Sequence, residues 1–148
     1  MIEITEHPLD PLLPLAAVAS NEAGANLLFL GTTRQWTGET ETRELDYECY
    51  REMAERKLAD LAAEARDRWN LTGVAIVHRI GTVRPGETSL AVAVSSPHRP
   101  ESFAAGQWLI EAIKQVVPVW KREVDNSGQG TWVHPARSGA TGSDESSR

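Results

Sequence analysis

Lysine is rare in this chain, which has twelve arginines but only Lys57, Lys114 and Lys121, and the last two lie seven residues apart. An arginine supplies permanent charge, whereas the pKa of a lysine falls readily on burial or beside another cation, which frees an amine for proton transfer or attack. We therefore interpret Lys114 and Lys121 as a candidate catalytic pair. From spacing alone, two ordinary surface lysines are the more common alternative.

Pro118 lies between these two lysines. Proline lacks the amide that would bond to the carbonyl of residue 114, so a helix that carries Lys114 must kink or end at Pro118. We expect the two ammonium groups to converge, one from the end of a helix and the other from the segment after the turn.

His98 and Arg99 follow a predicted strand and precede a predicted helix. Backbone amides and the helix dipole favour anions at such a place, and a guanidinium can bind phosphate through two hydrogen bonds. His98 could also move a proton near neutral pH. A capping loop with an exposed His and Arg is an equally good interpretation of this motif by itself.

Two other polar segments could contact an anion. The run from Thr32 to Arg34 follows the end of a predicted strand, where hydroxyls, amides and a guanidinium meet. The run from Lys121 to Glu123 extends the second candidate lysine. Each segment, taken alone, is also consistent with a solvated surface charge.

Hydrophobic periodicity predicts the elements that position these side chains. Helices are expected at 10–20, 53–69 and 103–117, and strands at 26–30, 45–49, 74–80, 90–94 and 131–133, with a polar loop at 32–40. The strand at 26–30 should be buried. The apolar stripes expected of the two longer helices are Ala54, Leu58, Leu61, Ala65 and Trp69 in the first, and Phe103, Gly106, Ile110, Ile113 and Val117 in the second. The strands at 74–80 and 90–94 should form an antiparallel pair through the turn at Arg84–Glu87. This order favours an α+β fold over a parallel doubly wound sheet.

The bulk composition limits the possible functions. With 148 residues we expect one domain over 1–137, followed by a Ser/Gly-rich tail at 138–148 that is disordered. A net charge of -6 disfavours nonspecific nucleic-acid binding. One cysteine, no basic leader and no long apolar run predict a cytoplasmic protein without membrane spans. No spacing suits metal ligation, so we expect no metal and no cofactor.

Several motifs follow one another along the chain: Gly31-Thr-Thr-Arg34, His78-Arg-Ile-Gly81 before Pro85-Gly86, and the segment from Ser96 through Gly106 to Lys114 and Trp120-Lys-Arg-Glu123. Together they resemble the large-subunit family of molybdopterin synthase. The resemblance covers about residues 26 to 134, and an ordered series of motifs is more specific than any one of them.

This resemblance implies an α/β hammerhead-type single domain with an antiparallel sheet and two main helices. It also implies a homodimer that binds two small ubiquitin-like subunits, forming a heterotetramer. Each small subunit would carry sulfur as a thiocarboxylate on its C-terminal Gly-Gly tail. Two transfers to cyclic pyranopterin monophosphate would form the molybdopterin dithiolene.

The resemblance also assigns residues. Lys114 and Lys121 match the catalytic lysines, with Lys114 as acid/base or amine nucleophile and Lys121 in charge stabilisation. The implied substrate-binding residues are Thr32, Thr33, Arg34, His98, Arg99, Lys114, Lys121, Arg122, Glu123 and Arg137.

Two other functions are compatible with the residues themselves. One is a noncatalytic module that binds a partner's tail through the lysines, which should tolerate Lys114→Arg. The other is a Schiff-base enzyme acting on a carbonyl substrate, which borohydride would trap on Lys114.

Overall fold

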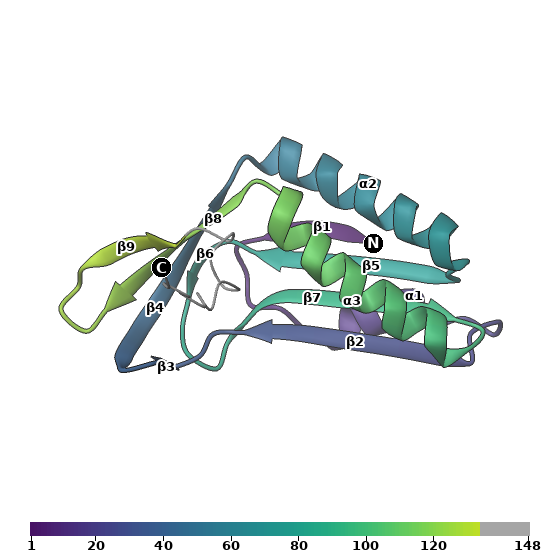
Figure 1. Ribbon diagram of the computed structural model, residues 1–148, viewed down its shortest axis with the longest axis horizontal. Coiled ribbons are helices and arrows are strands. Elements are labelled where there is room, and N and C mark those ends of the chain that lie inside the picture. The colour runs from purple at the N-terminus through teal and green to yellow at the C-terminus, as the bar shows by residue number, and fades with distance from the viewer. Residues whose placement is uncertain (134–148) are drawn as a thin grey trace, which may run out of the picture.

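The computed structural model describes residues 1–133, which fold into two β-sheets and three helices (Figure 1). Along the chain the elements are β1 (Ile2–Thr5), α1 (Leu12–Val18), β2 (Ala25–Thr32), β3 (Trp36–Thr37), β4 (Thr40–Cys49), α2 (Arg51–Trp69), β5 (Gly73–Arg79), β6 (Gly81–Val83), β7 (Thr88–Ser96), α3 (Arg99–Val116), β8 (Val119–Asp125) and β9 (Gly130–Val133). Arg137 and the tail expected at 138–148 lie outside the described residues. The α+β class is confirmed.

The first sheet has the strand order β1-β5-β7-β2. β5 and β7 are antiparallel, as predicted, and so are β7 and β2. β1 pairs with β5 in parallel, with Ile2 opposite Ile76. The first sheet is therefore mixed, whereas every strand pair of the second sheet, described below, is antiparallel, as the expected antiparallel sheet requires. The sequence analysis missed β1 because a strand of four residues carries too little periodicity to be recognised.

Helices cover both faces of this sheet. α2 and α3 pack on one face, over the side chains of Val74, Ile76, Val92 and Val94. α1 packs on the other, where Val18 meets Ala75 and Ala93. The two sets of side chains alternate along β5 and β7, as successive residues of a strand must.

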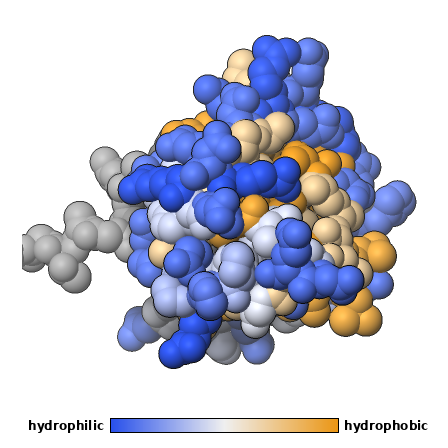
Figure 2. All heavy atoms as spheres, turned by 90° about the vertical axis from the view of Figure 1, so that its right-hand side faces the viewer, coloured by the Kyte–Doolittle hydropathy of each residue, from blue (hydrophilic) through white to orange (hydrophobic). Residues whose placement is uncertain are grey.

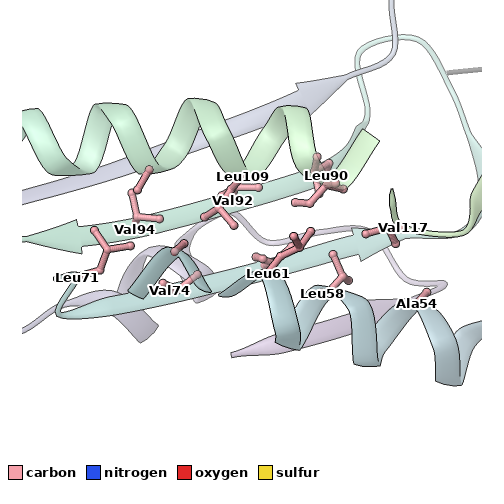
Figure 3. Close-up of a cluster of buried hydrophobic side chains, with 14 of the residues drawn as sticks. Ala54, Leu58, Leu61, Leu71, Val74, Leu90, Val92, Val94, Leu109 and Val117 are labelled. Atoms are coloured by element: carbon pink, nitrogen blue, oxygen red, sulfur yellow. The ribbon is translucent and has the colours of Figure 1, made fainter. Parts of the chain in front are cut away.

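The main core lies between this sheet and the two long helices (Figure 3). The predicted apolar stripe of α2 is confirmed, since Ala54, Leu58, Leu61 and Ala65 are all buried. The stripe predicted for α3 is partly wrong, because Phe103 is 62% exposed. The buried face of α3 is instead formed by Ser102, Ala105, Gly106, Leu109 and Ile113.

β2 also differs from its prediction as a buried strand. It is the edge strand of the first sheet and pairs only with β7 among the described residues. Leu27, Leu28 and Phe29 are half-buried, and Leu30 is exposed. A free edge strand with apolar side chains is a surface that other chains can pair with.

The second sheet has the order β3-β4-β8-β9, with β6 also paired to β4. α3 ends at Val116, two residues before Pro118, as the sequence predicts. The segment after this turn forms β8 from Val119, a strand that the sequence analysis did not predict. Lys121 of β8 lies opposite Tyr47 of β4. The short β3 forms a hairpin with β4 inside the segment predicted as a loop. No helix in residues 1–133 is long and apolar enough to span a membrane.

Candidate functional site

Three basic side chains from different elements meet where α3 gives way to β8. Lys114 lies in the last turn of α3, Lys121 is the third residue of β8, and Arg34 follows β2. Burial lowers the pKa of the Lys121 ammonium, the Glu123 carboxylate raises it in part, and the charges of Lys114 and Arg34 lower it further. The three cations are therefore within electrostatic range of one another, while Lys114 and Arg34 are exposed and Lys121 is half-buried.

Glu123 is held beside Lys121 by a buried threonine. Residues 121 and 123 of a strand point to the same face, so both side chains belong to the cationic cluster. The hydroxyl of Thr42, a residue that is 3% exposed, donates a hydrogen bond to the Glu123 carboxylate. Because Thr42 belongs to β4, the pairing of β4 with β8 fixes the carboxylate in place.

A neutral aromatic pair lies on the adjoining part of β4 and β5. The rings of Tyr47 and His78 meet edge to face at 5.5 Å, and Nδ1 of His78 lies 2.9 Å from the carbonyl oxygen of Arg79. Burial lowers the pKa of His78 and raises the pKa of Tyr47. Both side chains thus stay uncharged near neutral pH. Because Tyr47 lies opposite Lys121, this pair adds an uncharged, less polar wall beside the cationic cluster.

Two of the expected binding side chains do not join this cluster. Arg122 points to the opposite face of β8, where its Nη2 lies 2.8 Å from Oδ2 of Asp46. The Thr33 side chain is 5% exposed, and its hydroxyl is buried, so it is not presented to a ligand. Its backbone instead fixes the loop, since the Thr33 amide donates to Glu87 and its carbonyl accepts from Gly86.

His98 and Arg99 lie at the other end of α3 from Lys114. His98 is the N-cap residue, Arg99 is the first helical residue, and both are exposed. At a rise of about 1.5 Å per residue, sixteen residues of helix separate His98 from Lys114 by about 24 Å. Figure 1 shows α3 running the length of the first sheet between these two ends. One chain by itself does not bring the two groups together.

The end of the molecule where α3 begins has a mostly hydrophilic surface, with hydrophobic residues gathered to one side of it (Figure 2). His98 and Arg99 are therefore available to a partner rather than covered by their own chain. Arg137, the last of the expected binding residues, lies outside the described part of the chain.

The sequence analysis missed Thr42, Tyr47 and His78 as neighbours of the site. The alternation of Leu45, Tyr47 and Cys49 placed Tyr47 on one face of a strand but could not show what that face contacts. His78 enters the sequence analysis only as part of the motif His78-Arg-Ile-Gly81, which does not show what its ring contacts. Nothing in the sequence indicates that a residue of β4 lies beside a residue 81 positions later.

The arrangement can bind an anion and assist proton transfer. Three cations with one carboxylate leave an excess of positive charge at the cluster, although the whole chain is acidic. A half-buried lysine near other cations gives up its proton more readily than a solvated one. The cluster therefore fits chemistry on an anionic small molecule.

Comparison with known proteins identifies the family and agrees with this architecture. Residues 4–116 match the model of the family described as MoaE protein. The molybdopterin synthase catalytic subunit of Bacillus subtilis is 42% identical over 131 residues, which cover 88% of this chain and 83% of that protein. The corresponding subunit of Thermoplasma volcanium is 41% identical, over 88% of this chain and 96% of that protein.

Solved structures give the same answer. Molybdopterin synthase from Staphylococcus aureus superposes with a TM-score of 0.85 at 36% identity, over 89% of this chain and 96% of that one. A complex of subunits 1 and 2 of the molybdopterin-converting factor from Helicobacter pylori has a TM-score of 0.73 at 19% identity, over 92% of this chain and 90% of that one. At that identity the second structure shows a shared fold.

The fold and the match over most of the chain define an α+β sulfurtransferase subunit. The chain belongs to the MoaE family, whose function is that of the catalytic subunit of molybdopterin synthase in molybdenum cofactor biosynthesis.

Proposed function

We propose that the cluster of Lys114, Lys121 and Arg34 is the site where sulfur passes from a thiocarboxylate to cyclic pyranopterin monophosphate. The thiocarboxylate is the C-terminus of a small ubiquitin-like subunit, and two transfers complete the dithiolene. The observation that carries this proposal is the lowered pKa of Lys121, which the burial of Lys121 and the charges of Lys114 and Arg34 produce together. Both reactants are anions, so the same excess of positive charge attracts each of them.

The two lysines have different surroundings, which supports different roles. Lys114 is exposed at the end of α3, where it can reach a substrate and act as acid, base or amine nucleophile. Lys121 is half-buried beside Glu123, and its fixed position suits stabilisation of developing negative charge. Arg34 anchors the phosphate. Arg122 faces Asp46 and acts outside the reacting atoms.

The decisive experiment mixes this protein with thiocarboxylated small subunit and cyclic pyranopterin monophosphate and measures molybdopterin formation. Wild type should form product, and Lys114→Ala should form at least about a hundredfold less while still binding the small subunit, which is the loss expected of an acid/base group. Lys114→Arg distinguishes a docking role from a catalytic one. Arginine keeps the positive charge that docking needs, but it cannot replace an amine that transfers a proton or attacks the substrate. A wild-type protein that binds the small subunit without forming product would refute the proposal.

We also propose that two copies of this chain pair across α3 and β2 and share their sites. A groove of about 470 Å³ runs between these elements, and its floor is apolar. The groove is lined by Leu27, Leu28, Phe29, Phe103, Ala104, Gly106, Gln107, Ile110 and Glu111. Phe103 is 62% exposed beside it, and β2 has a free edge in the described structure. Such exposed apolar surface is typical of an interface between subunits.

A twofold pairing of this kind would bring His98 and Arg99 of the second copy to the cluster of Lys114, Lys121 and Arg34. In a twofold dimer the same surface of each copy contacts the other. Gly106, which lines the groove, lies midway between His98 and Lys114 in the sequence of α3. If two α3 helices cross antiparallel near Gly106, the start of one helix lies beside the end of the other. The phosphate would then contact Arg34 of one copy and Arg99 of the other.

Mixed dimers test this sharing. A heterodimer of a Lys114→Ala chain and an Arg99→Ala chain, purified through two different tags, retains one site with both residues intact if sites are shared. We expect about half of the wild-type activity, far above either mutant homodimer. If each chain holds its own site, the heterodimer will be no more active than the two homodimers mixed after purification.

The cytoplasmic location expected from the single cysteine stays a prediction, and fractionation of cells that make the protein would test it.

A further inference from the structure

A second pocket lies on the face of β8 that points away from Lys121. Its volume is about 430 Å³, and it is lined by Glu48, Cys49, Tyr50, Trp120 and Trp132. Trp120 and Lys121 are neighbours in β8, so their side chains project to opposite faces of the sheet. β4, β8 and β9, which carry most of the pocket, form the end of the molecule away from the start of α3 (Figure 1).

The walls of this pocket are aromatic rings that remain open to solvent. Tyr50 and Trp120 meet edge to face, with ring centroids 5.2 Å apart and planes at 84°. Tyr50 is 67% exposed, Trp120 is 38% exposed and Trp132 is 49% exposed. Three exposed aromatic side chains around one hollow form a surface typical of protein interfaces, where Tyr and Trp often contribute most of the binding energy.

The charge beside these rings is negative. Glu44, Asp46 and Glu48 alternate along β4 on the face that carries the pocket, and Glu48 lies opposite Trp120. Asp46 is neutralised by Arg122, and Glu44 has Arg43 nearby. Glu48 makes no ion pair within residues 1–133. A carboxylate next to the faces of Tyr and Trp is a favourable place for a cation.

Arg51, a cation of the chain close to this pocket in sequence, pairs with other groups. Arg51 follows the pocket residue Tyr50, but its guanidinium donates to the carbonyl of Ile4 and pairs with Glu6 and Glu55. Burial raises the pKa of the Cys49 thiol, so this wall is uncharged. Among the described residues Arg122 lies within electrostatic range of Glu48, but its guanidinium pairs with Asp46, so Glu48 is left without an ion-pair partner of its own beside the aromatic rings.

We propose that this pocket receives an arginine or lysine side chain from the body of the small subunit. This inference rests on the proposed function, because it assumes that the tail of the small subunit reaches Lys121. Trp120 precedes Lys121 in β8 and faces the other side of the sheet, but β9 pairs only with residues 121–124 of β8. A partner whose tail reaches Lys121 can therefore extend past the paired part of β8 to the face that carries Trp120. The second copy of this chain is proposed to pack on the groove between α3 and β2, which shares no lining residue with this pocket.

The test is the affinity of the small subunit, with its ordinary C-terminal carboxylate, for variants of this protein. Glu48→Lys and Trp132→Ala should each weaken binding by about tenfold or more, as expected for a central interface residue. Glu64→Lys makes the same change in charge on an exposed position of α2 and should leave the affinity unchanged. Product formation by the two pocket variants should recover when the small subunit is saturating.

A charge exchange identifies the partner residue. Each arginine and lysine of the small subunit is replaced by glutamate in turn, and one replacement should restore binding to Glu48→Lys while weakening binding to wild type. Unchanged affinity of the pocket variants would overturn the inference, as would restoration by none of the replacements. A change in the dimer mass of Glu48→Lys would also overturn it, because the pocket would then be a contact between copies.

The proposed function and this inference fail in different ways. If wild type binds the small subunit but forms no product, the catalytic proposal is wrong, and the affinities of the pocket variants still decide the inference. If wild type does not bind the small subunit, both are wrong.

Discussion

At the scale of single residues, the charge of the cluster depends on the pKa of Lys121, which neighbouring groups shift in opposite directions. Burial and the charges of Lys114 and Arg34 lower its pKa, and the carboxylate of Glu123 raises it. Thr42 keeps that carboxylate in position through a buried hydrogen bond. The protonation of Lys121 is therefore set by residues from β2, β4, α3 and β8 together.

Removing the Glu123 charge should move the pH dependence of the reaction. In Glu123→Gln nothing offsets burial and the neighbouring cations, so the pKa of Lys121 falls further. If Lys121 works as a cation, kcat at saturating substrates declines at a lower pH than in wild type. The measurement is the alkaline limb of the kcat profile for both proteins.

Two further variants control this prediction. Arg34→Gln removes a charge that lowers the pKa of Lys121, so its alkaline limb should move to higher pH. Arg122→Gln changes a residue on the opposite face of β8 and should leave the limb in place. An alkaline limb that is the same in all four proteins would show that Lys121 does not act through its charge.

His78 predicts how stability depends on pH. Burial lowers its pKa in the folded protein, while the unfolded chain keeps the ordinary value of about 6.5. Below that pH the unfolded state binds a proton that the folded state does not, so stability is complete above about pH 6.5 and declines as the pH falls toward the lowered pKa. In this window the contribution of His78 approaches about 1.4 kcal/mol per pH unit.

Urea unfolding between pH 7.5 and 5 measures this contribution. The free energy of unfolding should fall less steeply in His78→Gln than in wild type, even if the variant is less stable at every pH. His7→Gln, at an exposed position, should follow the wild-type slope. Parallel slopes for wild type and His78→Gln would mean that His78 takes up its proton without unfolding.

The sequence predicted the position of the two candidate lysines better than it predicted their neighbours. The rarity of lysine and the position of Pro118 singled out Lys114 and Lys121, and the structure places both at the α3–β8 junction. The contact of Thr42 with Glu123 could not be predicted, because it follows from the register of two strands far apart in the chain.

At the scale of elements, α3 acts as a spacer between two groups of site residues. Periodicity predicted this helix and its end, but not which apolar side chains it buries. Gly106 and Ser102 face the sheet, while Phe103 faces outward. Small residues on the inner face let the helix lie close to β2. The larger Phe103 side chain stays exposed on the outer face, where another chain can contact it. A periodic pattern alone cannot distinguish a face that packs within one chain from one that packs between chains.

Replacing Gly106 should loosen the packing of α3 on β2. A Cβ at this position would lie 2.8 Å from Cδ2 of Leu27, so valine forces the side chain or the helix to move. We expect Gly106→Val to lower the free energy of unfolding by about 1–3 kcal/mol, the usual cost of overpacking. Gln115→Val, at an exposed position of the same helix, controls for helix propensity. The measurement is urea unfolding of wild type and both variants at one protein concentration. If Gly106→Val is as stable as wild type, α3 does not pack on β2 as closely as the 2.8 Å approach implies.

At the scale of the whole molecule, the basic cluster, the apolar groove and the aromatic pocket lie on different elements of the fold. The first sheet with α3 provides the groove proposed for a second copy, and the second sheet provides the aromatic pocket proposed for the small subunit. The lysines proposed as catalytic, Lys114 and Lys121, lie at the junction of α3 and β8, where both proposed partners could reach them. The overall net charge of -6 gave no indication of this division, because it averages a local basic cluster with acidic surfaces.

Phe103→Asp should separate the two copies without unfolding either one. Phe103 is 62% exposed beside the groove, so a carboxylate there is solvated in the monomer but buried without a partner in the dimer. Light scattering should show the mass fall from two chains to one. The variant should still bind the small subunit, yet form as little product as Arg99→Ala, because the second copy's Arg99 is lost from the site. Leu12→Asp is the matched control, since Leu12 is 67% exposed on α1 at the opposite face of the sheet. That variant should remain dimeric and active, and a monomeric Phe103→Asp protein with full activity would show that each chain works alone.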